Sequence, residues 1–223
     1  MRSGQQAALG QDLVDLLDAL RIDQAVLAGY DWGGRAACIV AALFPERVNG
    51  LVTVDGYNIQ DIANAGDPAP PAWEKTSWYQ YYFHSARGRS GLEQNREAIR
   101  EMLWRDWSPT WAEATTAFRA SAISLHNPDF VDVVIHSYRH RFGLVDGDPR
   151  YDRLERRLAE QPRIGVPTIV IESGSDGVGG GSAADDRDFF TGEYEHRLLP
   201  NAGHNVPQEE PEAFADAVLA LLR

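Results

Sequence analysis

The sequence has one cysteine, no long uninterrupted apolar run and fewer basic than acidic residues, and each shortage excludes a class of protein. Cys38 cannot form an internal disulfide, and its apolar neighbours predict a buried thiol that packs like a small hydrophobic side chain. No apolar run is long enough to cross a bilayer, and no charged segment followed by an apolar stretch opens the chain. We therefore expect a cytoplasmic protein.

The charge balance narrows the choice of partners. The 33 acidic residues outnumber the 21 lysines and arginines, which gives a formal net charge of -12. Such a surface repels nucleic acid and anionic lipid, so neither is an expected partner. With 223 residues, 43% of them hydrophobic, the chain can bury a sizeable core. We expect a small, neutral and mainly apolar substrate, and a homodimer stays open.

Short apolar segments alternate with helical patterns at both ends of the chain. The strand pattern covers residues 25–28, 51–54, 166–171 and 194–199. The helical pattern covers residues 11–20, 35–44 and 211–222, and the first of these helices is expected to bury a leucine face that includes Leu16 and Leu20. Alternation of this kind predicts right-handed crossovers and an α/β fold with a mostly parallel sheet flanked by helices.

The middle of the chain has a different composition. Residues 57–161 are rich in aromatic and charged side chains with helical spacing and have little strand signal. We therefore predict that this segment is a helical cap inserted into an α/β core formed by residues 1–56 and 162–223.

Residues 29–34, with the sequence GYDWGG, fall between the first strand and the helix after it. A central residue flanked by small ones at such a position is typical of a nucleophile elbow, a sharp strained turn that exposes one side chain. Glycine is expected on both sides because a Cβ atom there would clash. Asp31 is the predicted nucleophile, and the Trp32 N–H, near the start of the helix, is the predicted oxyanion donor.

The residue type of the nucleophile determines which class of reaction is expected. A carboxylate is ionised at neutral pH without the help of a base, and it can displace a leaving group at saturated carbon to form an alkyl ester. Hydrolysis of that ester needs a general base to activate water. His204 is the predicted base, because it follows the last strand on a loop and completes the chain order nucleophile, acid, base.

Two carboxylates compete for the role of orienting His204. Asp176 follows the strand before the last one, and Asp55 ends the strand after the elbow. We favour Asp176 because it completes the expected chain order, and Asp55 stays open as the alternative acid. The predicted chemistry needs no metal and no organic cofactor.

Residues 29–34 (GYDWGG), 174–176 (GSD) and 202–204 (AGH) together resemble the epoxide hydrolases of the α/β-hydrolase fold. The resemblance covers nearly the whole chain. Residues 78–83 (WYQYYF) and 136–139 (HSYR) are similar to the two segments that supply ring-opening tyrosines, and the resemblance implies this role for Tyr79 and Tyr138. Two phenols would donate to the epoxide oxygen as the ring opens.

The chain also departs from the family pattern. Tyr30 stands where the epoxide hydrolases usually have histidine before the nucleophile. The family fold places several strands, and a loop with a His-Gly motif, ahead of the elbow strand, whereas only one helix and one strand precede Asp31. We therefore predict a sheet that lacks its N-terminal part. Haloalkane and fluoroacetate dehalogenases share the elbow, so a dehalogenase is the alternative enzyme, and an inactive binding protein or gene fragment is the alternative outside enzymes.

Overall fold

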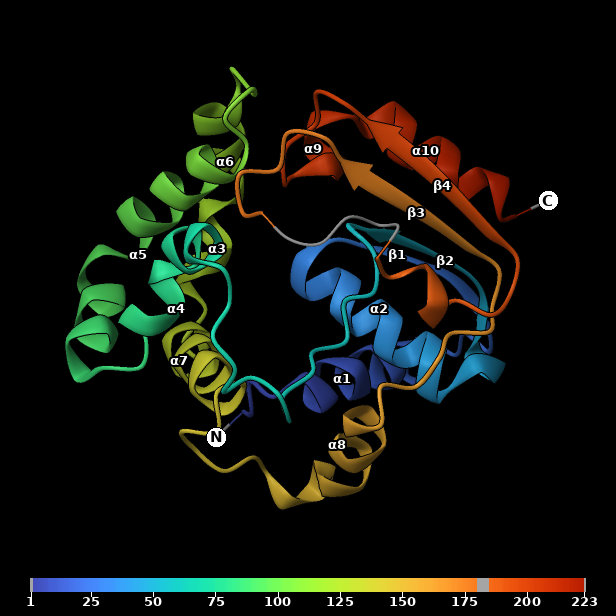
Figure 1. Cartoon of the computed structure of the whole chain (residues 1–223), viewed down its shortest axis with the longest axis horizontal. Helices are drawn as coiled ribbons and strands as arrows, with labels where there is room; N and C mark the ends of the chain where they lie inside the picture. Colours follow the sequence, from blue (N-terminus) through green and yellow to red (C-terminus); the bar gives the residue numbers. More distant parts are fainter. Residues whose placement is uncertain (1, 180–184, 223) are drawn as a thin grey trace.

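The computed structural model describes residues 2–179 and 185–222, which form a parallel sheet covered by helices on both faces (Figure 1). In this part of the chain the sheet has four strands in the order β1-β2-β3-β4, and every neighbouring pair is parallel. The strands are β1 (Ala25–Gly29), β2 (Val48–Val54), β3 (Thr168–Ser173) and β4 (Tyr194–Leu199). The predicted α/β fold with a parallel sheet is confirmed.

Successive side chains of the central strands pack alternately into two hydrophobic cores, one on each face of the sheet. Leu51 and Val170 pack into one core with residues of α1 (Gln6–Ala19) and α2 (Asp31–Leu43). Val52 and Ile169 face the opposite core, against α9 (Val206–Glu209) and α10 (Pro211–Ala220). Because successive side chains of a strand point to opposite faces, a strand buried on both sides must be apolar throughout, as β2 and β3 largely are.

The first helix differs from the prediction in its extent and its buried face. It begins at Gln6, and Leu16 and Leu20 are exposed, so the expected leucine face is wrong at these positions. The contact with α2 runs through small residues instead, since a Cβ atom on Gly10 would lie 2.3 Å from Ile39. Close approach of two helix backbones needs such residues, and a hydrophobic pattern does not reveal this.

Between β2 and β3 the described chain forms helices and loops (Figure 1). The helices are α3 (Pro71–Thr76), α4 (Trp78–Tyr82), α5 (Ala86–Trp107), α6 (Ala114–Ser121), α7 (Phe130–His140) and α8 (Asp152–Ala159). Side chains of α4, α5 and α7 form a third hydrophobic cluster around Phe83 and Leu103. Leu158 of α8 instead joins the core beside α1 and α2.

Four short 3-10 turns complete the described elements, at Pro45–Arg47, Ala122–His126, Pro149–Tyr151 and Arg187–Phe189. Among the helices that the structure describes, none has the length and apolar character that a membrane crossing requires.

Candidate active site

Asp31 lies at the sharp turn between β1 and α2, with a backbone φ of +46°. This left-handed conformation is strained for a residue with a side chain, and such strain is typical of a functional turn. A Cβ atom on Gly29 would lie 2.5 Å from the Gly33 carbonyl carbon, so glycine is required there. The same expectation is wrong for Gly33, where a Cβ atom would meet nothing within 4 Å.

The backbone of α2 begins at the turn itself. Asp31 and Trp32 are the first two residues of this helix, and N–H groups of a first helical turn have no acceptor within the helix. The Trp32 N–H is therefore free of intrahelical bonding beside the Asp31 carboxylate. Together with the positive end of the helix dipole, it favours negative charge at this turn.

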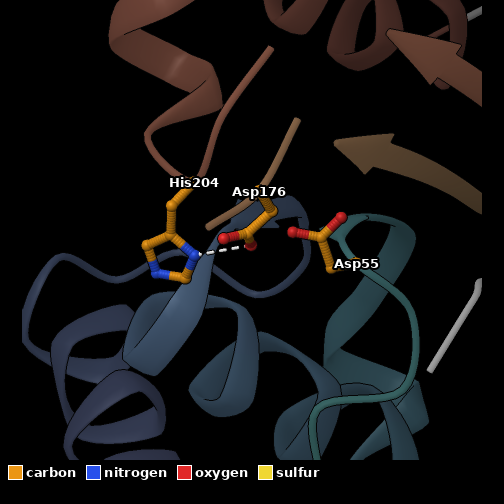
Figure 2. A group of neighbouring side chains, drawn as sticks. All are labelled: Asp55, Asp176 and His204. Carbon is orange, nitrogen blue, oxygen red and sulfur yellow. Dashed lines mark hydrogen bonds and ion pairs between the residues drawn. The ribbon is translucent and has the colours of Figure 1, made fainter. Parts of the chain in front are cut away.

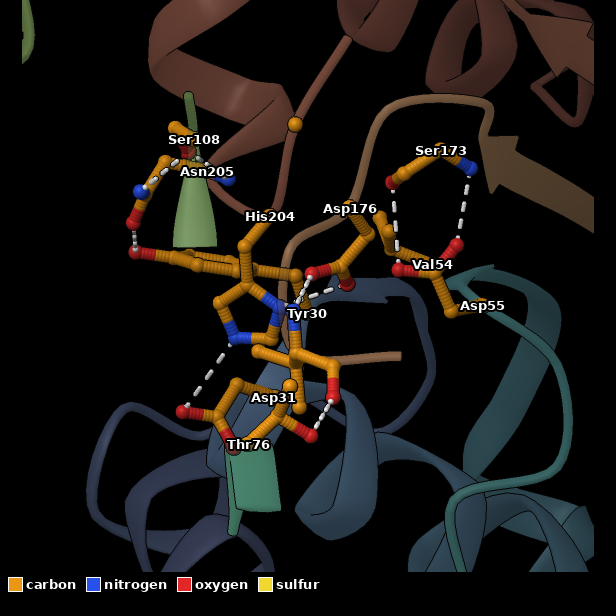
Figure 3. Close-up of polar contacts among 12 residues, drawn as sticks. Tyr30, Asp31, Val54, Asp55, Thr76, Ser108, Ser173, Asp176, His204 and Asn205 are labelled. Carbon is orange, nitrogen blue, oxygen red and sulfur yellow. Dashed lines mark hydrogen bonds and ion pairs between the residues drawn. The ribbon is translucent and has the colours of Figure 1, made fainter. Parts of the chain in front are cut away.

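His204 lies between two of the predicted carboxylates (Figure 3). Its Nδ1 is 2.9 Å from Asp176 Oδ2, a hydrogen-bonding distance, and its Nε2 is 3.7 Å from Asp31 Oδ2. The side chains of His204 and Asp176 are 13% and 14% exposed, so little water screens the pair. An ionised Asp176 accepts from Nδ1–H, which leaves Nε2 directed toward Asp31.

The pKa values of Asp31 and His204 shift in opposite directions. Burial alone would raise the pKa of Asp31, but His204 and the more distant cations Arg35 and Arg100 lower it well below its usual range. Burial alone would lower the pKa of His204, but the hydrogen bond to Asp176 and the charge of Asp31 raise it to about 10. At neutral pH the site therefore holds a carboxylate and an imidazolium.

Asp55 is near this pair but is bonded elsewhere. Figure 2 shows Asp176 lying between His204 and Asp55. The Asp55 carboxylate accepts hydrogen bonds from the Ser173 N–H, at 2.8 Å, and from the Ser173 hydroxyl, at 3.1 Å. Burial and the charge of Asp176 raise the pKa of Asp55 to about 7. Ligand atoms of Asp55, Asp176 and His204 lie within 4.8 Å of one another, which is the spacing of groups that can hold a metal ion.

Two acceptor groups that the sequence did not reveal hold the loops that carry Asp176 and His204. The Trp107 carbonyl, at the end of α5, accepts from the N–H of His204 at 3.1 Å and from the N–H of Gly177 at 2.9 Å. The Glu209 carboxylate accepts from the N–H groups on either side of His204, those of Gly203 and Asn205, both at 2.8 Å. These contacts fix both loops relative to each other.

Tyr30 packs beside the base. Its ring lies edge-on to the His204 ring, with centroids 5.9 Å apart. Its hydroxyl accepts a hydrogen bond from the Gln208 side chain at 3.3 Å and lies 3.5 Å from Asn205 Oδ1. The tyrosine that departs from the family pattern therefore borders the loop of His204.

Tyr79 on α4 and Tyr138 on α7 are brought together by the fold. Both side chains are buried, and their rings meet edge to face with centroids 5.5 Å apart. Burial, together with Tyr138 and Asp31 nearby, raises the pKa of Tyr79 well above its ordinary value, so this phenol keeps its proton at neutral pH. Both tyrosines line the cavity that Asp31 and His204 also line.

The cavity has a volume of about 590 Å³ and a largely polar wall. It brings together Asp31, Asp55, Tyr79, Tyr138, Asp176 and His204. Its wall also includes Arg35 and Arg141, which the sequence analysis did not single out. Arg35 lies one helical turn after Asp31, and that spacing was the one available signal.

The fold and the site correspond to a known family. Residues 3–211 match the model of the alpha/beta hydrolase fold family, and the chain belongs to it. The described sheet has fewer strands than the full fold of that family. The family match therefore identifies the fold of this chain.

Particular relatives point to one branch of the family. The crystal structure of a candidate epoxide hydrolase from Klebsiella pneumoniae subsp. pneumoniae matches with a TM-score of 0.96 and 46% identity, over 99% of this chain and 73% of that one. Epoxide hydrolase 1 of Caenorhabditis elegans is 25% identical over 95% of this chain. The predicted resemblance to epoxide hydrolases is confirmed.

Other similarities are broader. The 3-oxoadipate enol-lactonase 2 of Acinetobacter baylyi is 27% identical over 96% of this chain. The chain spans about half the length, 51%, of the C. elegans protein and 70% of the lactonase.

Proposed function

We propose that this protein hydrolyses epoxides to diols through an alkyl ester on Asp31, without metal or organic cofactor. An Asp31 oxygen attacks a ring carbon, the ring C–O bond breaks, and the alkoxide takes a proton from Tyr79 or Tyr138. A water molecule then adds to the ester carbonyl as His204 takes its proton. The acyl–oxygen bond breaks, the leaving alkoxide takes the proton from His204, and the diol leaves.

The observation that carries the proposal is the placement of a base between two carboxylates beside a pair of phenols. His204 contacts Asp176 through one ring nitrogen and faces Asp31 with the other. Tyr79 and Tyr138 share the cavity with this group. A halide leaves carbon without needing a proton, whereas an epoxide oxygen does need one, so the buried phenols favour epoxide opening over dehalogenation.

The charges explain how one histidine serves both steps. In the free enzyme the charge of Asp31 helps hold His204 protonated. Esterification removes that charge, so the pKa of His204 falls and the ring can give its proton to the tyrosine phenolate left by ring opening. A neutral imidazole, held by Asp176, is then available to activate water. The Trp32 N–H would stabilise the oxyanion of the tetrahedral intermediate.

The helices between β2 and β3 fit the role of a cap. We propose that residues 57–161 form this cap, with α8 at its end packed against the core through Leu158, and that residues 1–56 and 162–223 form the core. The two proposed acids come from α4 and α7, and Asp31 and His204 come from the loops of the sheet. Closure of the cap over the core would exclude water from the charged groups and strengthen their interactions.

A single-turnover experiment in H₂¹⁸O tests the proposal. With enzyme in excess over epoxide, the first diol should carry no label, because its new oxygen comes from Asp31. The label should appear in the peptide that contains Asp31 by mass spectrometry. Label in the first diol would mean that water attacks the ring directly, and would contradict the proposal. Heat-inactivated enzyme is the control for spontaneous hydrolysis.

A further inference from the structure

We propose that Arg35 and Arg141 form a carboxylate-binding subsite in the nucleophile cavity, so that the substrate is an epoxide bearing a carboxylate. This proposal deepens the proposed epoxide hydrolysis and rests on it for the chemistry. It replaces the neutral, mainly apolar substrate expected from composition. The binding claim, however, stands on the two arginines themselves.

Both guanidinium groups are buried in the cavity wall. Arg35 and Arg141 are each 8% exposed, and both line the cavity with Asp31. Lysine and arginine are rarely so deeply buried unless a partner neutralises them. Within residues 2–179 and 185–222, however, neither arginine forms an ion pair with a carboxylate.

The hydrogen bonds of Arg35 leave one of its guanidinium nitrogens without an acceptor. Its Nε donates to the Asn58 carbonyl at 3.3 Å, whereas its buried Nη1 has no acceptor in the described part of the chain. A buried charged donor without an acceptor is costly, and a ligand oxygen would remove that cost. Guanidinium groups bind carboxylates with two parallel N–H donors, which is the arrangement an unused Nη1 allows.

Arg141 is held in place by neutral groups. Its guanidinium carbon lies 4.3 Å above the centre of the Tyr138 ring. Its Nη1 and Nη2 donate to Gln80 Oε1 and Ser137 Oγ, both at 3.4 Å, and Nε and Nη1 reach the Gln60 side-chain oxygen at 3.2 Å when that amide is turned to accept. None of these groups neutralises the cation, so its charge remains available to a ligand.

The two cations act on each other and on the nucleophile. Burial, followed by repulsion from Arg141, lowers the pKa of Arg35 to about 10, while the charge of Asp31 opposes this. The two positive charges would offset the repulsion between Asp31 and the carboxylate of an incoming substrate.

The other acidic groups on the cavity wall are engaged elsewhere. Asp176 is bonded to His204, Asp55 accepts from Ser173, and Asp186 accepts from the N–H of Tyr57. Glu172 Oε2 lies 2.7 Å from His196 Nε2. None of these carboxylates therefore forms an ion pair with Arg35 or Arg141 in the described part of the chain.

The subsite specifies where the reacting ring sits. A carboxylate held by Arg35, four residues after Asp31 on α2, would leave an adjacent epoxide carbon facing Asp31 and the phenols. The chemical class is therefore a small epoxy acid with the carboxylate on or next to the ring. Opening it adds one water across a C–O bond and gives a dihydroxy acid, with no oxidant or reductant.

Two epoxides of similar size, one charged and one neutral, separate the effect of substrate charge on the rate from that of substrate shape. Glycidate carries a carboxylate on the epoxide, and glycidamide is its neutral counterpart of nearly equal size. We expect kcat/KM to be about 10- to 100-fold higher for glycidate, as expected for hydrogen bonds between charged groups. Arg35→Gln and Arg141→Gln should each lose most of this preference, while Arg35→Lys keeps part of it. Arg139→Gln, which removes a charge on α7 outside the cavity wall, should retain it.

Binding of the unreactive products distinguishes failure of the subsite from failure of the proposed function. Glycerate should bind the wild-type protein about 10-fold or more tightly than glyceramide by calorimetry, and only if both arginines are present. Selective glycerate binding without epoxide opening would keep the subsite and overturn the proposed function. Opening of glycidamide at least as fast as glycidate, with no preference for glycerate, would overturn the subsite. So would equal losses on both probes in the arginine variants, which would indicate only a bracing role for residues 58–60.

Discussion

His204 Nε2 lies 3.7 Å from Asp31 Oδ2, too far for a strong hydrogen bond but close enough for strong attraction between charges. The two residues are far apart in the sequence: Asp31 begins α2 directly after β1, and His204 lies on the loop after β4. Because the contact depends on charge, esterification of Asp31 would weaken it. In the proposed mechanism, this coupling links the attacking step to the water-activating step.

The same pair predicts how stability depends on pH. The pKa of His204 is raised from 6.5 to about 10 in the folded state, so its charge contributes stability that is complete below pH 6.5 and is lost as the pH rises through about 10. His204→Gln removes that contribution. The difference in melting temperature between wild type and His204→Gln should therefore be largest near pH 6 and shrink toward pH 10.5. A difference that grows with pH would mean that the histidine is neutral in the fold.

The lowered pKa of Asp31 predicts a second change in stability, this time at acidic pH. Its contribution is present above its usual pKa of 3.8 and is lost as the pH falls below that value. The difference in the free energy of unfolding between wild type and Asp31→Asn should therefore be smaller at pH 3 than at pH 6. Chemical denaturation of both proteins at these two pH values measures it.

The two candidate acids should differ in their effect on rate. Asp176→Asn should lower kcat by roughly 10³- to 10⁴-fold, because the orienting carboxylate is lost and the imidazolium is unsupported. Asp55→Asn should cost far less, since its carboxylate is bonded to Ser173 rather than to His204. Steady-state kinetics on one epoxide compares them directly. The reverse ranking would assign the triad acid to Asp55, as in the dehalogenase alternative.

Substitution of Tyr79 and Tyr138 tests which class of substrate the protein uses. Changing Tyr79 and Tyr138 together to Phe removes two hydroxyls while the buried rings still pack, so the melting temperature should change little. Epoxide opening should fall by about 10²-fold or more, the size of a general-acid contribution. Halide release from a haloalkane that is indifferent to this double change would assign the protein to the dehalogenases.

The two glycines that flank the nucleophile, Gly29 and Gly33, should respond differently to substitution by alanine. Gly29→Ala places a Cβ atom 2.5 Å from Gly33 and should cost about 1–3 kcal/mol, as overpacking does. Gly33→Ala meets open space within α2 and should be neutral or stabilise the fold by roughly 0.5–1 kcal/mol through helix propensity. Urea denaturation of both variants provides the comparison. Equal losses would contradict this description of the turn.

Much of this architecture is local in origin and could be predicted from the sequence. The strand ending at Gly29 and the helix that follows it are short-range signals, and β4 begins and ends at the predicted residues, Tyr194 and Leu199. Parallel pairing then brings the loops after these strands to one edge of the sheet. That is why Asp31, Asp176 and His204 meet as the motif order suggested.

What the sequence could not provide depends on contacts between distant segments. Arg141 reaches the cavity because α7 packs beside α4, and no periodic pattern records that approach. The Trp107 carbonyl is a backbone group, so residue type carries no sign of its role. The exposed Leu16 shows the converse, a hydrophobic residue in helical register that the packing of α1 leaves uncovered.

In the proposed mechanism, Asp31 becomes covalently attached to the substrate and His204 releases it. Intact-mass measurement on His204→Gln after incubation with an epoxide tests this most directly. We predict an added mass equal to that of the epoxide, located on the peptide containing Asp31, and no such adduct in the double variant Asp31→Ala/His204→Gln. Normal turnover by His204→Gln without an adduct, or an adduct that persists when Asp31 is removed, would contradict the account.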